Sequence, residues 1–250
     1  TSKEFVKIIN QNTIAPTAPR FGVITDSLPA GQYIIALIGS VGDVNPGTDD
    51  GSSPPFRILW AVLPGNDIFY KRIELTVNGS VNQIVSLDRV VAKLKLVVRD
   101  RIPFDAKQIE IHPNMTDPQN PQQTVGTPNA LDLADGVILP SGPLPFYQYG
   151  SHLHEFTADE KGMENFTIES YQLVKGPGTI NTATINVDIK VTDSQSHVLG
   201  AKTVQGVKLF AGKGTVLSGK LFDGLNTSDS GLNVILNDPE WVNDSIQVNF

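Results

Sequence analysis

Apolar and polar residues alternate along much of this chain, which is the pattern of strands in a half-buried sheet. Successive side chains of a strand point to opposite faces, so every second residue lies inward. Two such runs flank Asn78-Gly79, a dipeptide that favours a tight two-residue hairpin turn because both residues accept a positive φ. Alternation predicts strands on either side of that turn within 75–87, and at 90–98, 109–111, 184–191, 207–210, 215–222 and 245–250.

The same pattern predicts which side chains of each strand face the core. In the run 90–98, Lys93 and Lys95 are expected to face water, and Ala92 and Leu94 to face inward. No window carries apolar residues at the i, i+3, i+4, i+7 spacing of an amphipathic helix over three turns. Strands and turns recur at a spacing of roughly 8–12 residues, which favours sheets packed face to face. The pattern therefore predicts an all-β protein.

A segment rich in Pro, Asn, Gln, Asp and Gly separates two sets of predicted strands. It covers residues 113–145, and loops of that length are uncommon inside one compact domain. The length of 250 residues also allows two ordinary β domains. We therefore expect an N-terminal β-sandwich domain over residues 1–145 and a C-terminal β-sandwich domain over residues 146–250.

Charge and cysteine content exclude several classes of function. The formal net charge of −7 repels phosphate backbones, so nucleic acid is not expected as a partner. The absence of cysteine excludes disulfides, thiol catalysis and Cys-ligated metals within this sequence. No apolar stretch is long enough to span a bilayer. Because the sequence starts at Thr1 without Met, we expect a mature or trimmed chain, and a lipid-modified Cys ahead of Thr1 is left open.

Two groups of residues are candidates for metal binding. His152 and His154 are two apart, a spacing that puts both imidazoles on one face of a strand, although a metal would need a third ligand from elsewhere. The alternative is an exposed polar strand or loop next to the linker segment. The oxygen-rich segment 43–51 superficially resembles a Ca²⁺ loop, but no Glu closes it, and a solvated hairpin tip is the alternative. We therefore assign no metal ligands and expect no cofactor.

Enzymatic function has no positive support in the sequence. No Gly-x-Ser-x-Gly nucleophile elbow is present, and the Gly-rich stretch 212–215 leads into a predicted strand instead of a helix. No catalytic residue is assigned, and a non-enzymatic protein is expected. The alternative function is a surface glycan-binding β-sandwich protein, for which the aromatic side chains of Trp60, Phe146, Tyr147 and Tyr149 are the candidates. Packing between domains is the other interpretation of residues 146–149.

Three stretches of the sequence carry the motifs of a known family. Leu28, Gly31 and Tyr33 precede an apolar strand. The stretch 85–94 contains the motif "Leu-x-Arg-x-x-Ala-Lys" through Leu87, Arg89 and the Ala92-Lys93 pair. The stretch 213–222 is followed by Asn237, Trp241 and a terminal strand ending in Phe250. Together, and in this order, they resemble the start, a strand late in the N-terminal domain, and the anchor-like and tip-like C-terminal domain of the fimbrillin-like (type V) pilin and pilus-anchor superfamily.

The resemblance implies two transthyretin-like β-sandwiches in tandem. It also implies export as a lipoprotein to the outer membrane and cell surface, where such proteins build a fimbrium (pilus) and mediate cell adhesion. The membrane would be contacted only through a lipid anchor absent from this chain. The partners implied are other pilus subunits, joined by strand addition, and ligands on host or bacterial surfaces. Stalk, tip and anchor roles all stay open.

Assembly in the polymerising branch of this superfamily begins with proteolysis after a basic residue near the N-terminus. Arg20 is the basic residue placed for such a cut, and an ordinary surface charge is its alternative role. The strand removed would cover residues 5–9, and a neighbour's strand would fill the groove by β-augmentation. The 245–250 strand is the candidate for insertion into its own domain or into a neighbour. The expected exchanged positions are Phe5, Val6, Ile8, Ile246, Val248 and Phe250.

Overall fold

A computed structural model shows an all-β protein. The structure describes residues 6–11, 22–40, 57–59, 67–116, 124–126, 130–133, 135–136, 138–139, 152–174, 182–222, 233–236 and 246–249. These ranges contain strands β1 to β16 and no helix, so the all-β prediction is confirmed. It follows that no helix in the described ranges is long and apolar enough to cross a membrane.

One end of the molecule is a four-stranded antiparallel sheet, which we call the N-sheet. Its strands lie in the order β1-β3-β4-β16. A small sheet, β2-β8-β9, packs against it through Leu131, which shares a buried cluster with Ile68 and Tyr70 of β3. The bounds are β1 Gly31–Ser40, β3 Ile68–Val77, β4 Ile84–Arg89, β16 Ile246–Asn249, β2 Arg57–Leu59, β8 Ala130–Asp132 and β9 Ile138–Leu139.

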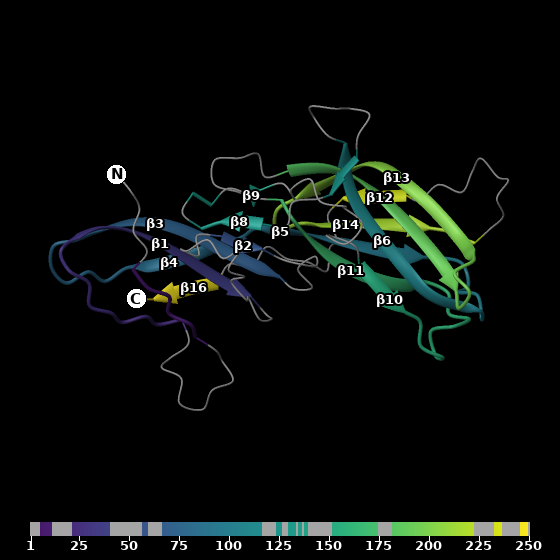
Figure 1. The fold of residues 1–250 in the computed structure, drawn as a ribbon, viewed down its shortest axis with the longest axis horizontal. Coiled ribbons are helices and arrows are strands. Elements are labelled where there is room, and N and C mark those ends of the chain that lie inside the picture. Colours follow the sequence, from purple (N-terminus) through teal and green to yellow (C-terminus); the bar gives the residue numbers. More distant parts are fainter. Residues whose placement is uncertain are drawn as a thin grey trace.

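The other end is a β-sandwich (Figure 1). One layer has the order β10-β6-β12-β13, with β7 also paired to β6, and the other has the order β11-β5-β14-β15. All pairs are antiparallel except β5 with β14. The bounds are β10 His152–Glu155, β6 Ala106–Thr116, β12 Thr182–Asp193, β13 Val198–Phe210, β7 Thr124–Gly126, β11 Phe166–Leu173, β5 Val91–Val98, β14 Gly214–Gly219 and β15 Asn233–Leu236.

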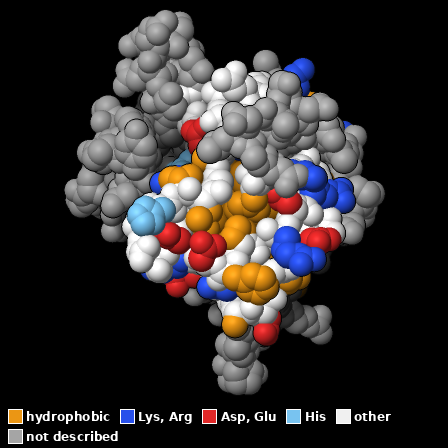
Figure 2. Space-filling model, turned by 90° about the vertical axis from the view of Figure 1, so that its right-hand side faces the viewer, with side chains coloured by type: hydrophobic (Ala, Val, Ile, Leu, Met, Phe, Trp, Pro, Cys, Tyr) orange, Lys and Arg blue, Asp and Glu red, His pale blue; other side chains and the backbone are white. Residues whose placement is uncertain are grey.

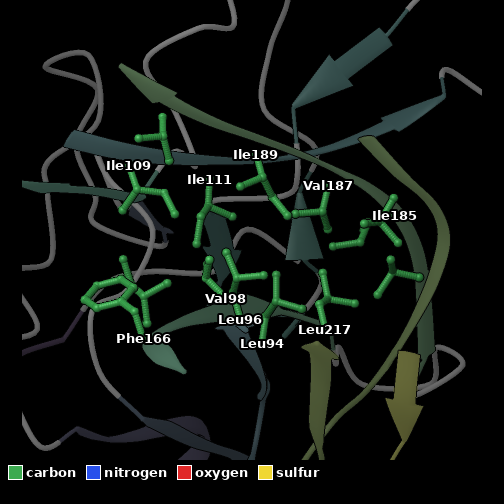
Figure 3. Packing of buried hydrophobic residues seen from close by; sticks show 14 of the residues in the cluster. Leu94, Leu96, Val98, Ile109, Ile111, Phe166, Ile185, Val187, Ile189 and Leu217 are labelled. Carbon is green, nitrogen blue, oxygen red and sulfur yellow. The ribbon is translucent and has the colours of Figure 1, made fainter. Parts of the chain in front are cut away.

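Branched aliphatic side chains from both layers fill the sandwich (Figure 3). Alternation explains which residues of each strand enter this core, because every second side chain of a strand points inward. The labelled members are Leu94, Leu96 and Val98 of β5, Ile109 and Ile111 of β6, Phe166 of β11, Ile185, Val187 and Ile189 of β12, and Leu217 of β14.

Strand pairing does not divide the chain at residue 145, contrary to the predicted domains 1–145 and 146–250. β5 and β6 precede that residue, yet they pair with β11, β14, β10 and β12, which follow it. β16 lies near the end of the sequence, yet it pairs with β4. Turn-rich composition reports local backbone preference, whereas the choice of partner strand depends on residues far apart in the chain. The 113–145 segment therefore does not mark a boundary between two sequential sheets.

A nearly continuous strand instead joins the N-sheet to the sandwich. β4 leads through Val90 directly into β5. The Val90 N–H donates to the Ile68 carbonyl of the N-sheet at 3.0 Å, and the Val90 carbonyl accepts from the Val174 N–H, just beyond β11, at 3.0 Å. Val90 and Val91 are buried with Ile68, Tyr70, Leu131 and Leu173 in a cluster that we call the joint cluster. The connection between the two ends is therefore a packed strand.

Two local predictions differ from the structure. Alternation predicts that Lys93 faces water, but the residue is only 6% exposed. It is buried because the same face of β5 and β11 also carries Val91, Tyr171 and Leu173, which pack in the joint cluster. Neither Asn78 nor Gly79 has a positive φ, so the predicted tight turn is absent. β3 and β4 pair only at Phe69–Arg89 and Tyr70–Asp88, far from that dipeptide.

Candidate functional site at the edge of the N-sheet

The last strand of the chain completes the N-sheet. β16 pairs antiparallel with β4, so that Ile246 lies opposite Leu87 and Val248 lies opposite Val85. Directly opposed residues share one face of a sheet. Val85 and Leu87 are buried with Leu37 and Phe69 in a second cluster of the N-sheet. The register therefore pairs positions 246 and 248 with two buried residues of β4.

The pairing of β16 with β4 is short, and it joins two strands that are far apart in the sequence. Four residue pairs hold the strand, from Ile246–Leu87 to Asn249–Ile84. A short edge strand has few backbone hydrogen bonds to lose, and the free energy of opening is low for such elements. Of the predicted exchange positions, the structure thus brings Ile246 and Val248 to a sheet edge.

The opposite edge of the N-sheet is formed by β1. All ten residues of β1 pair with β3 on one side, from Gly31–Val77 to Ser40–Ile68. No other strand of the described ranges pairs with β1. An edge of this length presents backbone N–H and C=O groups to which a further strand can be added.

The N-terminal segment does not form the predicted strand where it is described. Residues 6–10 are in no strand, and Val6 and Ile8 are exposed. Side chains attach the segment to residues 22–26. The Gln11 amide donates to the Val23 carbonyl at 2.7 Å and accepts from the Gly22 N–H at 2.9 Å, and Lys7 forms an ion pair with Asp26. No β-ladder holds residues 6–10, so side-chain contacts are what must break for them to leave.

Two ion pairs lie where the N-sheet meets the sandwich. The Arg89 guanidinium contacts both carboxylate oxygens of Asp67 at 2.6 to 2.8 Å, and it lies over the Phe69 ring at 5.0 Å from the centroid. The Lys93 Nζ is 3.4 Å from Glu169 Oε1. Burial raises the pKa of Tyr171, and the negative charges of Glu169 and Asp67 raise it further, against opposing effects of Lys93 and Arg89.

These ion pairs explain residues that the sequence analysis noted without a role. Arg89 and Lys93 belong to the stretch on which the family resemblance rests, and the structure gives both a buried position beside a carboxylate. Buried basic side chains are rare unless they are paired. Sequence reasoning missed Asp67 and Glu169, because the spacing along the chain says nothing of which carboxylates reach a given base.

The two histidines do not gather a metal site among the described residues. His154 Nε2 lies 2.9 Å from Glu160 Oε2, and the His154 ring packs beside Phe156 and Phe166. Burial, and then the neighbouring His154, lower the pKa of His152. No group of three or more His, Asp or Glu side chains in the described ranges could hold a metal ion. Both histidines lie in β10 and are half-buried, so they are less exposed than the polar-strand alternative predicts.

Several candidate residues lie outside the described ranges. They are Phe5, Arg20, residues 43–51, Trp60, Phe146, Tyr147, Tyr149, Asn237, Trp241 and Phe250. The roles expected of them stay predictions.

No protein-family model matches the chain, and neither does any curated protein. The chain is similar to solved structures. A candidate adhesin from Bacteroides ovatus is 14% identical with a TM-score of 0.38, over 71% of this chain and 66% of that one, just under two thirds. A candidate cell adhesion protein from Bacteroides ovatus is 11% identical with a TM-score of 0.41, over 93% of this chain and 73% of that one.

A candidate cell adhesion protein from Bacteroides fragilis is 13% identical with a TM-score of 0.29, over 98% of this chain and 94% of that one. Across the three structures the identity is 14% or less and the TM-score 0.41 or less. Values this low assign neither a family nor a function to the chain.

Proposed function

We propose that the chain is a non-enzymatic cell-surface protein that acts in cell adhesion as a subunit, tip or anchor of a fimbrium. In this proposal it is exported, held at the outer membrane through a lipid anchor, and assembled with other subunits by the addition of a β-strand. The fimbrial and lipoprotein parts rest on the resemblance of three stretches of the sequence to fimbrillin-like proteins. The solved structures described above bear names of adhesion proteins, which agrees with the proposal without carrying it.

The pairing of β16 with β4 is the observation that carries strand addition. A strand from the end of the chain is already inserted at the edge of a sheet formed mainly by the start of the chain. The backbone hydrogen bonds and the buried register do not depend on whether the strand comes from the same molecule or from another. A β16 strand from a second subunit would therefore satisfy the β4 edge equally well.

The cost of such an exchange is small. Each subunit gives up four residue pairs and gains the same four pairs with its neighbour. The net change is then the loss of freedom on association, set against any contacts that form between the subunits. Repeated exchange in one direction produces a filament, since a head-to-tail contact need not close on itself.

Engineered cysteines test this mechanism without background, because the chain contains none. Ser86 lies opposite Gln247 in the β4–β16 register, and directly opposed strand residues are within reach of a disulfide. The double variant Ser86→Cys with Gln247→Cys should close within one chain under oxidation. A mixture of the two single variants, one carrying a mass tag, should give a mixed disulfide dimer if β16 is exchanged.

A register control separates exchange from random collision. Ile84 lies opposite Asn249, two residues away from the Gln247 pair, and a diagonal separation of about 7–8 Å is beyond the reach of a disulfide. Ile84→Cys mixed with Gln247→Cys should therefore give little mixed dimer. The mixtures are repeated with chains that begin at Phe21, as after a cut following Arg20. The assembly mechanism is wrong, and β16 does not exchange, if the double variant closes but the mixture of Ser86→Cys and Gln247→Cys does not cross-link. This must hold both for the full chain and for chains that begin at Phe21.

A further inference from the structure

Two loops form a fixed surface at the end of the sandwich remote from the N-sheet. One connects β5 to β6 and the other connects β10 to β11. The Ile102 N–H donates to the Met163 carbonyl at 2.9 Å, and the Gly162 N–H donates to the Ile102 carbonyl at 2.8 Å. Ile102 itself is fully buried. The two backbone bonds and this apolar anchor hold both loops in one arrangement.

Phe104 is the most exposed large apolar side chain of the described ranges, at 75%. Its ring lies on Gly162, where a Cβ atom would come within 3.0 Å of the ring edge atom Cζ. Gly162 also has a φ of +83°, a conformation that residues with a side chain rarely adopt. A bare glycine backbone thus supports Phe104, and the ring is presented to solvent in a defined position.

Charged side chains lie in the same two loops. Arg101 Nη2 contacts Glu164 Oε1 at 3.1 Å, with side-chain exposures of 67% and 56%. Met163, between Gly162 and Glu164, is also exposed. Figure 2 looks onto this end of the molecule and shows apolar side chains gathered between acidic and basic ones. The two loops therefore combine an aromatic surface, hydrogen-bond donors and carboxylate acceptors.

We propose that this surface, comprising Arg101, Phe104, Met163 and Glu164, binds a neutral carbohydrate. A pyranose ring has one face of C–H groups and a rim of hydroxyl groups. The C–H face packs on the negative face of an aromatic ring. The hydroxyl groups exchange hydrogen bonds with the guanidinium and the carboxylate of an exposed ion pair, whose groups keep spare donors and acceptors.

A sugar fits these observations better than a protein partner does. A stable protein interface takes roughly 20–30 residues from each side, whereas these loops offer two exposed large apolar side chains, Phe104 and Met163. A few polar groups around an apolar surface are what orient a small ligand. The inference supplies a ligand class for adhesion and rests on the adhesive role proposed above, but it does not depend on strand exchange.

Methionine methyl NMR tests the site, because the chain has only two methionines. Met163 belongs to the proposed surface, whereas Met115 packs against the sandwich core and serves as an internal reference. The intact chain is first applied to a printed array of neutral glycans, and the oligosaccharides that bind are then titrated against ¹³C-methyl-labelled protein. The methyl signal of Met163 should shift saturably while that of Met115 stays in place.

Substitutions connect the response to Phe104. Phe104→Ala should weaken binding at least about tenfold, as is typical of an aromatic anchor, and should leave the melting temperature nearly unchanged because the ring is exposed. Arg101→Ala should weaken binding to a lesser extent. Val198→Ala is the matched control, since Val198 is an exposed apolar residue at the start of β13, and it should bind as the unaltered chain does.

Any of the following results would overturn the carbohydrate site. They are the absence of any bound glycan, binding that persists in Phe104→Ala, and binding that leaves Met163 unshifted. A purified protein that binds through Phe104 in the absence of any saccharide response would also overturn it. The Ser86→Cys and Gln247→Cys cross-linking experiment, repeated with chains that also carry Phe104→Ala, reports strand exchange independently of glycan binding. Failure of the carbohydrate site is therefore distinguishable from failure of the assembly mechanism.

Discussion

At the scale of single residues, the phenol of Tyr70 couples folding to pH. The side chain is 4% exposed, and its O–H donates to the Leu133 carbonyl at 2.8 Å. Burial is the main reason that the pKa of Tyr70 is raised from 10.0 to about 12. The charge of Arg72 opposes this shift, and those of Asp132 and Asp135 add to it.

This shift predicts a loss of stability at alkaline pH. The folded-state pKa is higher than the unfolded-state value, so the contribution of Tyr70 is fully present below pH 10.0 and is lost as the pH rises towards about 12. Tyr70→Phe should lower the free energy of unfolding at pH 7 by about 1 kcal/mol, because the hydrogen bond is gone. Between pH 10 and 12, however, urea titrations should show a smaller decline for Tyr70→Phe than for the unaltered chain. Equal declines would contradict the assignment.

At the scale of elements, a bulge shapes the long pair β12–β13. The register shifts between Ile185–Val207 and Val187–Val204, so two residues of β13 lie opposite Asn186. Gly206 is at this point with a φ of +67°, and its N–H donates to the Asn186 side chain at 3.2 Å. A bulge with glycine in the left-handed region increases the local twist and interrupts a long edge strand, which discourages unwanted pairing.

Gly206 and Gly79 both have open space around them, so replacing each with alanine tests backbone strain without steric crowding. A Cβ atom at Gly206 or at Gly79 would meet nothing within 4 Å, but only Gly206 has a positive φ. Gly206→Ala should therefore destabilise the protein by roughly 1–2 kcal/mol, and Gly79→Ala should stabilise it by about 0.4–1 kcal/mol by restricting the unfolded chain. Thermal unfolding of both variants measures the difference. Destabilisation by Gly79→Ala would instead support the tight turn that the sequence predicts at Asn78-Gly79.

At the scale of the whole molecule, the joint between the N-sheet and the sandwich predicts cooperative unfolding. The nearly continuous strand through Val90 and the joint cluster connect the two ends, and a shared core makes separate unfolding unfavourable. Asp67→Asn replaces the carboxylate that contacts the Arg89 guanidinium, whose side chain is 8% exposed, with a neutral amide. The free energy of unfolding should fall by about 3 kcal/mol, with circular dichroism and tryptophan fluorescence keeping coincident midpoints in urea.

An exposed ion pair provides the control for this experiment. Arg101→Ala removes the contact with Glu164, in which both side chains are more than half exposed, and should change the free energy of unfolding by less than about 1 kcal/mol. Two separate transitions in either variant would show that the two ends fold independently, contrary to the joint described here.

Much of the strand content could be predicted from the sequence. The predicted strand at 184–191 lies inside β12, and the run 90–98 differs from β5 by one residue. Of the candidate site, the terminal alternation at 245–250 correctly predicted a strand, which the structure has as β16. Alternation is a local signal, because one face of a strand is buried and the other is solvated whichever strand lies beside it. It also identified the core residues Ala92 and Leu94, which are two positions apart.

The partners of each strand were decided only in the tertiary structure. The insertion of β16 beside β4, the pairing of β5 with β11 and β14, and the burial of Lys93 depend on contacts between residues far apart in the chain. Ser170 and Gln172 also show this, since their positions in β11 direct them into the sandwich core. Within the described part of the chain, the Ser170 hydroxyl and the Gln172 amide have no hydrogen-bond partner there. The sequence thus determined where strands form, because that preference is local. Packing determined which edges meet, because that choice depends on the free energy of the whole chain.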